Sequence, residues 1–328
     1  MSPSTQLAAA QTTSGHGLPP AGTQQVAGHP DGVRAAARIR AAHNGRVTTL
    51  PQLHSDGPFH LRRLRTHGNA ATVGIISAMS APLGGDRLTL DITVEERAEL
   101  EITTAAATLA LRGPTTSAAT YDVRLTVGEH ARLRWLPQPL ISAAGSNLRQ
   151  TYTVELAATS RLVLREEQLL GRADEEPGHL VTRILVHRTG CPLFDQHTAY
   201  GAPEPGWDGP AVLNGHRAVG QLLIVDPRLD VRRDPVLLGG EGTQDGCAVL
   251  APLAGGPALL ATAVAPTTSR LRHLLDQAHA HALAAVEASG PAVPVAPSGE
   301  PTRCGREKPG ARRHDGAHAA QSEITRST

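Results

Sequence analysis

One sequence pattern occurs three times in the middle of this chain. Each unit has an alternating apolar run, a short polar break and a second alternating run. Alternation on both sides of a tight break is typical of a strand, a turn and a strand. The paired runs are 88–94 with 99–104, 121–127 with 132–136, and 151–156 with 161–166. Because no single unit can bury its apolar face alone, the pattern predicts an all-β fold, a layered β-helix-like or solenoid body of repeated strand-turn-strand units.

A later segment, about 269–287, has the spacing of a helix. Its apolar residues form one stripe, and Ser269 is a candidate N-cap. The stripe consists of Leu271, Leu274, Leu275, Ala278, Ala282 and Val286. We therefore expect one or two C-terminal helices packed on the β body or on a partner.

The two ends of the chain differ from its middle. Residues 1–33 are poor in apolar side chains, and residues 289–328 are rich in Pro and then in basic residues. Such segments cannot bury enough apolar surface to offset the entropy of ordering. The sequence therefore predicts a disordered N-terminal arm over 1–33, one β-rich domain over 34–288 and a disordered tail over 289–328.

Charge and composition argue against several classes of partner. The net charge is +1 and aromatic residues are 2% of the chain, so neither broad attraction nor stacking platforms favour nucleic acid. No apolar stretch reaches the roughly twenty unbroken residues that span a bilayer, and no export signal is visible. Three scattered cysteines form no Cys-x-x-Cys pair. We expect a soluble cytoplasmic protein that binds neither nucleic acid nor membrane.

The common catalytic motifs are missing from the sequence. It contains no Gly-x-Ser-x-Gly elbow, no Walker-type phosphate loop and no His-Glu-x-x-His. We therefore expect no enzyme and assign no catalytic or cofactor-binding residue. Two alternatives stay open: a β-solenoid carbohydrate-active enzyme, which would need paired carboxylates, and a generic interaction scaffold.

Four short motifs occur in a fixed order around the three repeats. Pro-Leu-Gly-Gly-Asp at 82–86 precedes the first repeat, and the other three, 103–108, 136–141 and 169–172, each follow one. In this order they resemble the UreD family of urease accessory proteins, also called UreH. The resemblance covers about 62–225, with weaker support to about 286.

The resemblance implies a maturation scaffold with a layered β-helix-like body. Such a protein binds apo-urease and recruits UreF, which in turn carries the GTPase UreG that delivers nickel. An interior passage for nickel is also implied. We accordingly expect no tightly bound cofactor and nickel only in transit.

Several residues match the motifs of the family. Gly84, Gly85, Pro137 and Pro139 are expected to fix backbone geometry, and Ile141, Gly171 and Arg172 complete the matched elements. Asp86, Glu167 and Arg172 are candidates for an internal polar path or a buried ion pair, with a purely structural pairing as the alternative. Of these, Asp86 and Glu167 are the candidates for a nickel conduit; no firm metal site is assigned.

Overall fold

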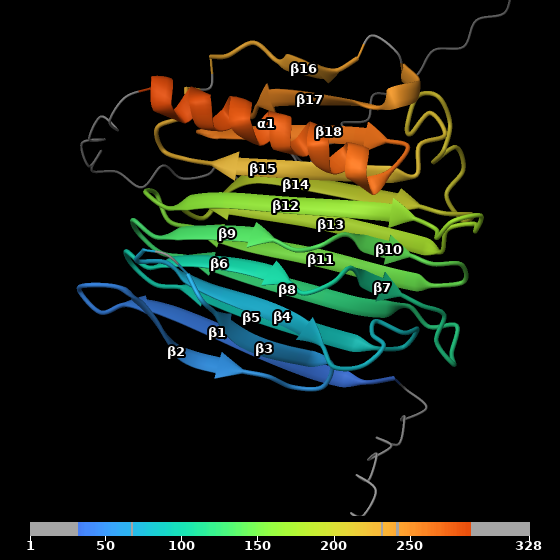
Figure 1. Ribbon diagram of the computed structural model, residues 1–328, viewed down its shortest axis with the longest axis horizontal. Helices are drawn as coiled ribbons and strands as arrows, with labels where there is room; N and C mark the ends of the chain where they lie inside the picture. Colours follow the sequence, from blue (N-terminus) through green and yellow to red (C-terminus); the bar gives the residue numbers. More distant parts are fainter. Residues whose placement is uncertain (1–31, 67, 231, 241–242, 290–328) are drawn as a thin grey trace, which may run out of the picture.

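The residues that the structure describes fold into two large β-sheets that lie face to face, with one α-helix outside them (Figure 1). The computed structural model describes residues 32–66, 68–230, 232–240 and 243–289. The first sheet, sheet A, has seven strands. Their spatial order is β14 (Cys191–Tyr200), β13 (His179–Arg188), β11 (Asn147–Leu156), β8 (Ala119–Val127), β5 (Arg87–Val94), β1 (Arg34–His43) and β2 (Thr48–His54).

The second sheet, sheet B, has eleven strands. Nine form a continuous path: β16 (Val236–Gly239), β17 (Cys247–Pro252), β18 (Ala258–Ala265), β15 (Ala218–Val225), β12 (Arg161–Leu170), β9 (Arg132–Leu136), β6 (Glu99–Thr104), β4 (Ala71–Ser77) and β3 (Phe59–Leu64). Two short strands, β7 (Thr108–Ala110) and β10 (Leu140–Ser142), pair with each other, and β10 also pairs with β12. A short 3-10 helix covers Thr243–Asp245.

The three sequence repeats are three coils of a solenoid. Each contributes one strand to sheet A and one to sheet B: β5 with β6, β8 with β9, and β11 with β12. The two strands of a unit do not pair with each other. They pair in parallel with their counterparts in the next unit, as Leu88 does with Tyr121 and Leu100 with Leu133. The predicted all-β solenoid of strand-turn-strand units is confirmed.

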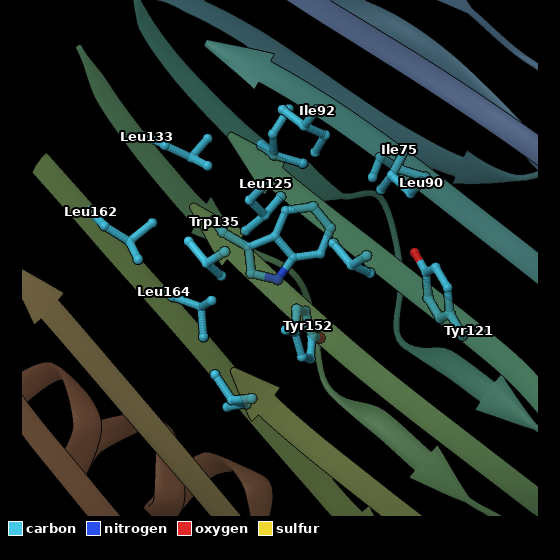
Figure 2. Packing of buried hydrophobic residues seen from close by; sticks show 14 of the residues in the cluster. Ile75, Leu90, Ile92, Tyr121, Leu125, Leu133, Trp135, Tyr152, Leu162 and Leu164 are labelled. Atoms are coloured by element: carbon cyan, nitrogen blue, oxygen red, sulfur yellow. The ribbon is translucent and has the colours of Figure 1, made fainter. Parts of the chain in front are cut away.

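The main core lies between the two sheets. Alternate residues of each strand point inward, for example Leu90 and Ile92 from β5 and Leu162 and Leu164 from β12. Figure 2 shows these side chains around the indole of Trp135. Most inward positions are aliphatic or aromatic, so the polar exceptions are informative.

The helix α1 (Thr268–Ala288) covers the outer face of one half of sheet B, over β15, β17 and β18 (Figure 1). All six residues of the predicted apolar stripe are buried. Gly220 of β15 allows the close approach, because a Cβ there would lie 2.9 Å from Cδ1 of Leu275. The N-cap is Thr267, whose Oγ1 accepts from the amide of Arg270 at 3.2 Å, so the prediction of Ser269 was wrong.

Most of the two predicted arms, 1–31 and 290–328, lies outside the described residues, so their disorder stays a prediction. Among the described helices, none has the length and apolar character required to cross a membrane.

Candidate functional site

Sheet B is interrupted between β6 and β7 and again between β9 and β10. Residues 105–107 and 137–139 leave the strand path at these two points. Pro137 and Pro139 have no N–H to donate to a ladder, which favours such a break. Two hydrogen bonds join these two segments. Gln138 N donates to Oγ1 of Thr104 at 2.9 Å, and Thr108 N donates to the Pro139 carbonyl at 2.9 Å. The break opens the wall of the solenoid beside β12.

A row of polar side chains crosses sheet A at one level of the core. Gln150 of β11 is in register with Tyr121 of β8 and with Thr182 of β13. Thr182 is in turn paired with Thr198 of β14, and their hydroxyl oxygens are 2.7 Å apart. The next level of the same strands is Val123, Tyr152 and Ile184.

Sheet B contributes Glu166 and Gln221, which are cross-strand partners on β12 and β15. Partners in an antiparallel pair project to the same face of a sheet, and Glu166 continues the inward phase of Leu162 and Leu164. Both are almost fully buried. We call these residues the polar layer: Tyr121, Gln150, Thr182 and Thr198 from sheet A, with Glu166 and Gln221 from sheet B.

Three oxygens of the polar layer carry unused hydrogen-bonding capacity. Among the described residues, Oε1 of Glu166, Oε1 of Gln150 and Oε1 of Gln221 have no hydrogen-bond partner. Buried oxygens of this kind are costly unless water or a cation satisfies them. The orientation of the Gln150 side-chain amide is set by a hydrogen bond, in which its Nε2 donates to the Tyr152 hydroxyl at 3.0 Å.

A small cavity lies where the polar layer meets the break in sheet B. It has a volume of about 20 Å³ and is lined by Gln150, Tyr152, Glu166, Trp135 and residues of the break. That volume accommodates about one water molecule or ion. Figure 2 shows Trp135 and Tyr152 side by side in this part of the core; their rings meet edge to face, with centroids 6.1 Å apart.

Burial controls the protonation of the acidic groups in and around the cavity. Desolvation raises the pKa of Glu166 to about 7, although a hydrogen bond with Gln168 opposes the shift. Burial, and then the Glu166 charge, raise the pKa of the Tyr152 phenol well above its ordinary value. Desolvation likewise raises the pKa of Tyr200 to about 12. Near neutral pH, Glu166 therefore exchanges between a neutral acid and a carboxylate while both phenols stay protonated.

A wider groove lies next to the cavity. It has a volume of about 370 Å³ and shares Thr104, Thr108 and Tyr121 with the lining of the small cavity. Its other walls include Phe59, Ile75 and the segment 77–82. The small cavity is thus a neighbour of a groove whose lining residues are uncharged.

Glu167 lies on the opposite face of β12, toward α1. Its side chain is 1% exposed and forms ion pairs with Nε of Arg165 at 2.6 Å and Nη2 of Arg272 at 3.4 Å. Arg165 also pairs with Asp276 of α1, at 2.6 Å between Nη1 and Oδ1. The predicted conduit candidate Glu167 is therefore part of a buried ion-pair network between β12 and the helix, beside the break.

Asp86, the other conduit candidate, organises a turn. Its Oδ2 accepts from the amide of Leu83 and its Oδ1 from the amide of Val33, both at 2.8 Å. Both oxygens of this buried carboxylate are thus occupied by backbone donors, and Asp86 is absent from the lining of the cavity. The structure does not bring Asp86 and Glu167 together.

The matched glycines lie at tight positions. Gly85 has a φ of 94°, which favours glycine, and a Cβ on Gly84 would lie 2.9 Å from the Thr115 carbonyl oxygen. Gly171, with a φ of 84°, donates its amide to the Ser142 carbonyl at 2.9 Å. These three residues close turns next to the ends of strands.

Ile141 and Arg172 lie away from the cavity. Ile141 is the middle residue of β10 and is in register with Leu109 and Leu169. The side chain of Arg172 is 56% exposed, and its Nε and Nη2 each donate a hydrogen bond to the Glu175 carboxylate at 2.7 Å. Arg172 therefore forms a surface ion pair.

Sequence reasoning missed Glu166 as the residue that faces the interior. The third repeat was expected to end at Glu166, whereas β12 continues to Leu170. Had the alternation of Leu162 and Leu164 been extended, it would have placed Glu166 and Gln168 on the core face and Glu167 on the other. Within the described parts of the chain, no group of three or more His, Cys, Asp or Glu side chains could hold a metal ion.

Comparison with known proteins agrees with this architecture. The family model described as UreD urease accessory protein matches residues 33–296. Urease accessory protein UreD 2 of Saccharopolyspora erythraea is 64% identical over 247 residues, which cover 75% of this chain and 87% of that protein. UreD 3 of Streptomyces griseus is 54% identical over 251 residues, covering 75% and 95% of the two chains. UreD of Streptomyces coelicolor is 50% identical over 249 residues, covering 75% and 96%.

The alternative of a carbohydrate-active enzyme is contradicted by the family, and the two adjacent glutamates of β12 do not form a carboxylate pair. Glycoside hydrolysis needs two carboxylates on one site, whereas Glu166 and Glu167 project to opposite faces of β12. The matched family is one of accessory proteins. The chain therefore belongs to the UreD family of urease accessory proteins, which act in urease maturation and are not catalytic enzymes.

Proposed function

We propose that this chain is a cytoplasmic scaffold that binds apo-urease, recruits UreF and through it UreG, and lets nickel ions pass through its interior. The observation that carries the passage is the pair of unpartnered oxygens of Glu166 and Gln150, which line the cavity beside the break in sheet B, together with that of Gln221, the cross-strand partner of Glu166. These oxygens lie in an otherwise largely apolar core. Unpartnered polar groups in a core destabilise the fold, so a functional reason is expected for them, and contact with a transient cation is such a reason.

The chemistry of the polar layer suits a cargo ion. Its ligands are carboxylate, amide and hydroxyl oxygens, which bind nickel less firmly than clusters of imidazole or thiolate groups do. A passage must release its ion, so weak oxygen ligands fit this role. An arriving cation would displace the proton of Glu166, whose pKa of about 7 keeps this exchange accessible at neutral pH.

The experiment that tests the scaffold is co-expression of the tagged chain with the urease subunits, UreF and UreG. We expect copurification of the partners, and urease that contains nickel and hydrolyses urea only when the chain is present. A folded chain that neither copurifies nor changes activation would overturn the proposal.

The passage is tested in the same system by Glu166→Gln, which keeps the shape of the side chain and removes its charge. We expect an intact complex and a lower nickel content in the urease. The matched control is Glu99→Gln on the outer face of β6, where the carboxylate is 42% exposed. An unchanged nickel content in the Glu166 variant would remove the passage from the proposal and leave the scaffold.

Asp86 and Glu167 stay candidates for the same path. Replacing each by Ala, with copurification as the check on folding and assembly, tests their roles. If the nickel content is unchanged while the complex is intact, neither residue belongs to the path.

A further inference from the structure

The uncharged groove next to the small cavity presents apolar side chains to solvent. Its volume of about 370 Å³ lies in the range of ligand pockets. Two of its lining residues, Ile76 and Met79, are 39% and 36% exposed. Two aromatic residues, Phe59 and Tyr121, line it as well, with ring centroids 5.7 Å apart. The groove therefore offers an occupant aromatic and aliphatic surface without a charged group.

The described chain begins beside this groove. Val33 N donates to Oδ1 of Asp86 at 2.8 Å, and Oδ2 of the same carboxylate accepts from the Leu83 amide at 2.8 Å. A Cβ on Gly57 would lie 3.7 Å from Cγ1 of Val33. Leu83 and Gly57 are each next in sequence to a residue that lines the groove. Residues 1–31 therefore join the fold beside two walls of the groove.

Strand pairing places the chain entry at the same end of the sheets as the groove. β1 runs parallel to β5, with Arg34 in register with Arg87, and the connection from β4 to β5 contains the groove-lining segment 78–82 (Figure 1). The C-terminal residues 290–328 begin elsewhere, because they follow α1, which packs mainly on β15 and β18. The N-terminal arm is thus the nearer occupant.

The sequence of the arm matches the lining of the groove. Residues 1–30 contain no Asp, Glu, Lys or Arg, and they include the run Leu-Pro-Pro-Ala at 18–21. Proline fixes φ and restricts the residue before it, so such a run loses little conformational entropy on binding. Proline-rich segments dock in aromatic-lined grooves for this reason.

The run at 18–21 is within reach of the groove. Twelve residues separate Pro20 from Gly32, and they span about 40 Å when fully extended and about 20 Å on average as a flexible chain. A tether of this length gives an effective concentration of about 1 mM. An intrinsic Kd of about 0.1 mM would then suffice for an occupancy of about 90%.

We infer that residues 18–21 of this chain dock in the groove and cover it. Docking orders only these four residues, which is compatible with the predicted disorder of the rest of the arm. The groove shares Thr104, Thr108 and Tyr121 with the small cavity, so the docked arm also lies next to the cavity. An apolar segment of another protein can use the groove only after it displaces the arm. The groove and the chain entry are features of the fold, so this docking holds whether or not nickel passes through the interior.

Hydrogen exchange in the full chain tests the docking. The readout is the exchange of the backbone amides of 79–81 and 106–107, which line the groove outside the strands. We expect Leu18→Asp to speed this exchange about tenfold, because a carboxylate at residue 18 does not enter an apolar groove and an occupancy of about 90% is lost. The matched control is Leu7→Asp in the same arm, which should leave the exchange as in the parent chain. Circular dichroism checks that each variant is folded.

A synthetic peptide of residues 14–25 tests the specificity of the groove. At about 1 mM, the effective concentration of the tethered arm, it should restore slow exchange in the Leu18→Asp chain, whereas the same peptide with Leu18→Asp should not. Equal exchange in the parent chain and Leu18→Asp would overturn the docking, as would a peptide without effect. Equal acceleration by Leu7→Asp would overturn the assignment to 18–21. Protection that increases with protein concentration would mean that a second copy fills the groove, and would also overturn the inference.

Discussion

The buried Glu166 should make the stability of this protein depend on pH in a way that one substitution removes. Its pKa is raised from 4.5 to about 7 by burial, so the folded chain holds this proton more firmly than the unfolded chain. Stability from this group is therefore complete below about pH 4.5 and is lost as the pH rises to about 7. The shift corresponds to a loss of about 3 kcal/mol above pH 7.

Glu166→Gln removes the titration and keeps the size of the side chain. The difference in unfolding free energy between the variant and the parent should therefore grow from pH 5 to pH 8, in favour of the variant, by roughly 2.5 kcal/mol, since part of the loss has already occurred at pH 5. Urea unfolding followed by Trp135 fluorescence, in a Trp207→Phe background, measures this difference at each pH. Glu99→Gln, on the exposed face of β6, is the control for a general charge effect. A difference that stays constant across this range would refute the assignment of Glu166 as a buried acid.

Three further substitutions test the framework around the site by urea unfolding. Asp86→Asn should destabilise the chain by about 1–3 kcal/mol, because one of two backbone amides loses its acceptor. The control, Asp91→Asn at a surface ion pair, should cost less than about 1 kcal/mol. Equal effects of the two substitutions would contradict the role of Asp86 in the turn. Leu274→Ala, in the buried stripe of α1, should lower the free energy of unfolding by about 2–5 kcal/mol. Leu283→Ala, at a half-exposed position of the same helix, should lower it far less. A small decrease for Leu274→Ala would mean that α1 is loosely packed. Gly85→Ala should cost about 1 kcal/mol or more, since φ is 94° there, and an unchanged midpoint would refute the strain.

The solenoid could be predicted because its signal is local and repeated. The alternation of Leu88–Val94 and its two later copies marks strands whose inner faces must be covered, and the copies recur at intervals of roughly thirty residues. The apolar stripe of α1 could be predicted for the same reason, because its helical spacing is a local pattern. Outside the repeats, the apolar runs at 180–188, 220–226 and 248–253 were recognised as strands and correspond to β13, β15 and β17, whereas β1 and β14 were not recognised.

The candidate site was harder to predict because it depends on register and phase. Gln150, Tyr121 and Thr182 become neighbours only when β11 lies between β8 and β13, and no local pattern encodes that alignment. The phase of β12 decides which of two adjacent glutamates faces the core. A shift by one residue exchanges Glu166 for Glu167, and the sequence prediction named the second.

The parallel pairing of successive coils also determines how the protein can reach its native state. Leu88 pairs with Tyr121 a whole repeat later, so these contacts form only after a long loop has closed, which slows folding. Antiparallel neighbours such as β13 and β14 need only a short turn and can form early. Until the coils are stacked, each finished strand leaves an open row of backbone donors and acceptors, a surface on which other chains can add. A newly made chain is therefore most exposed to aggregation while its coils are still incomplete.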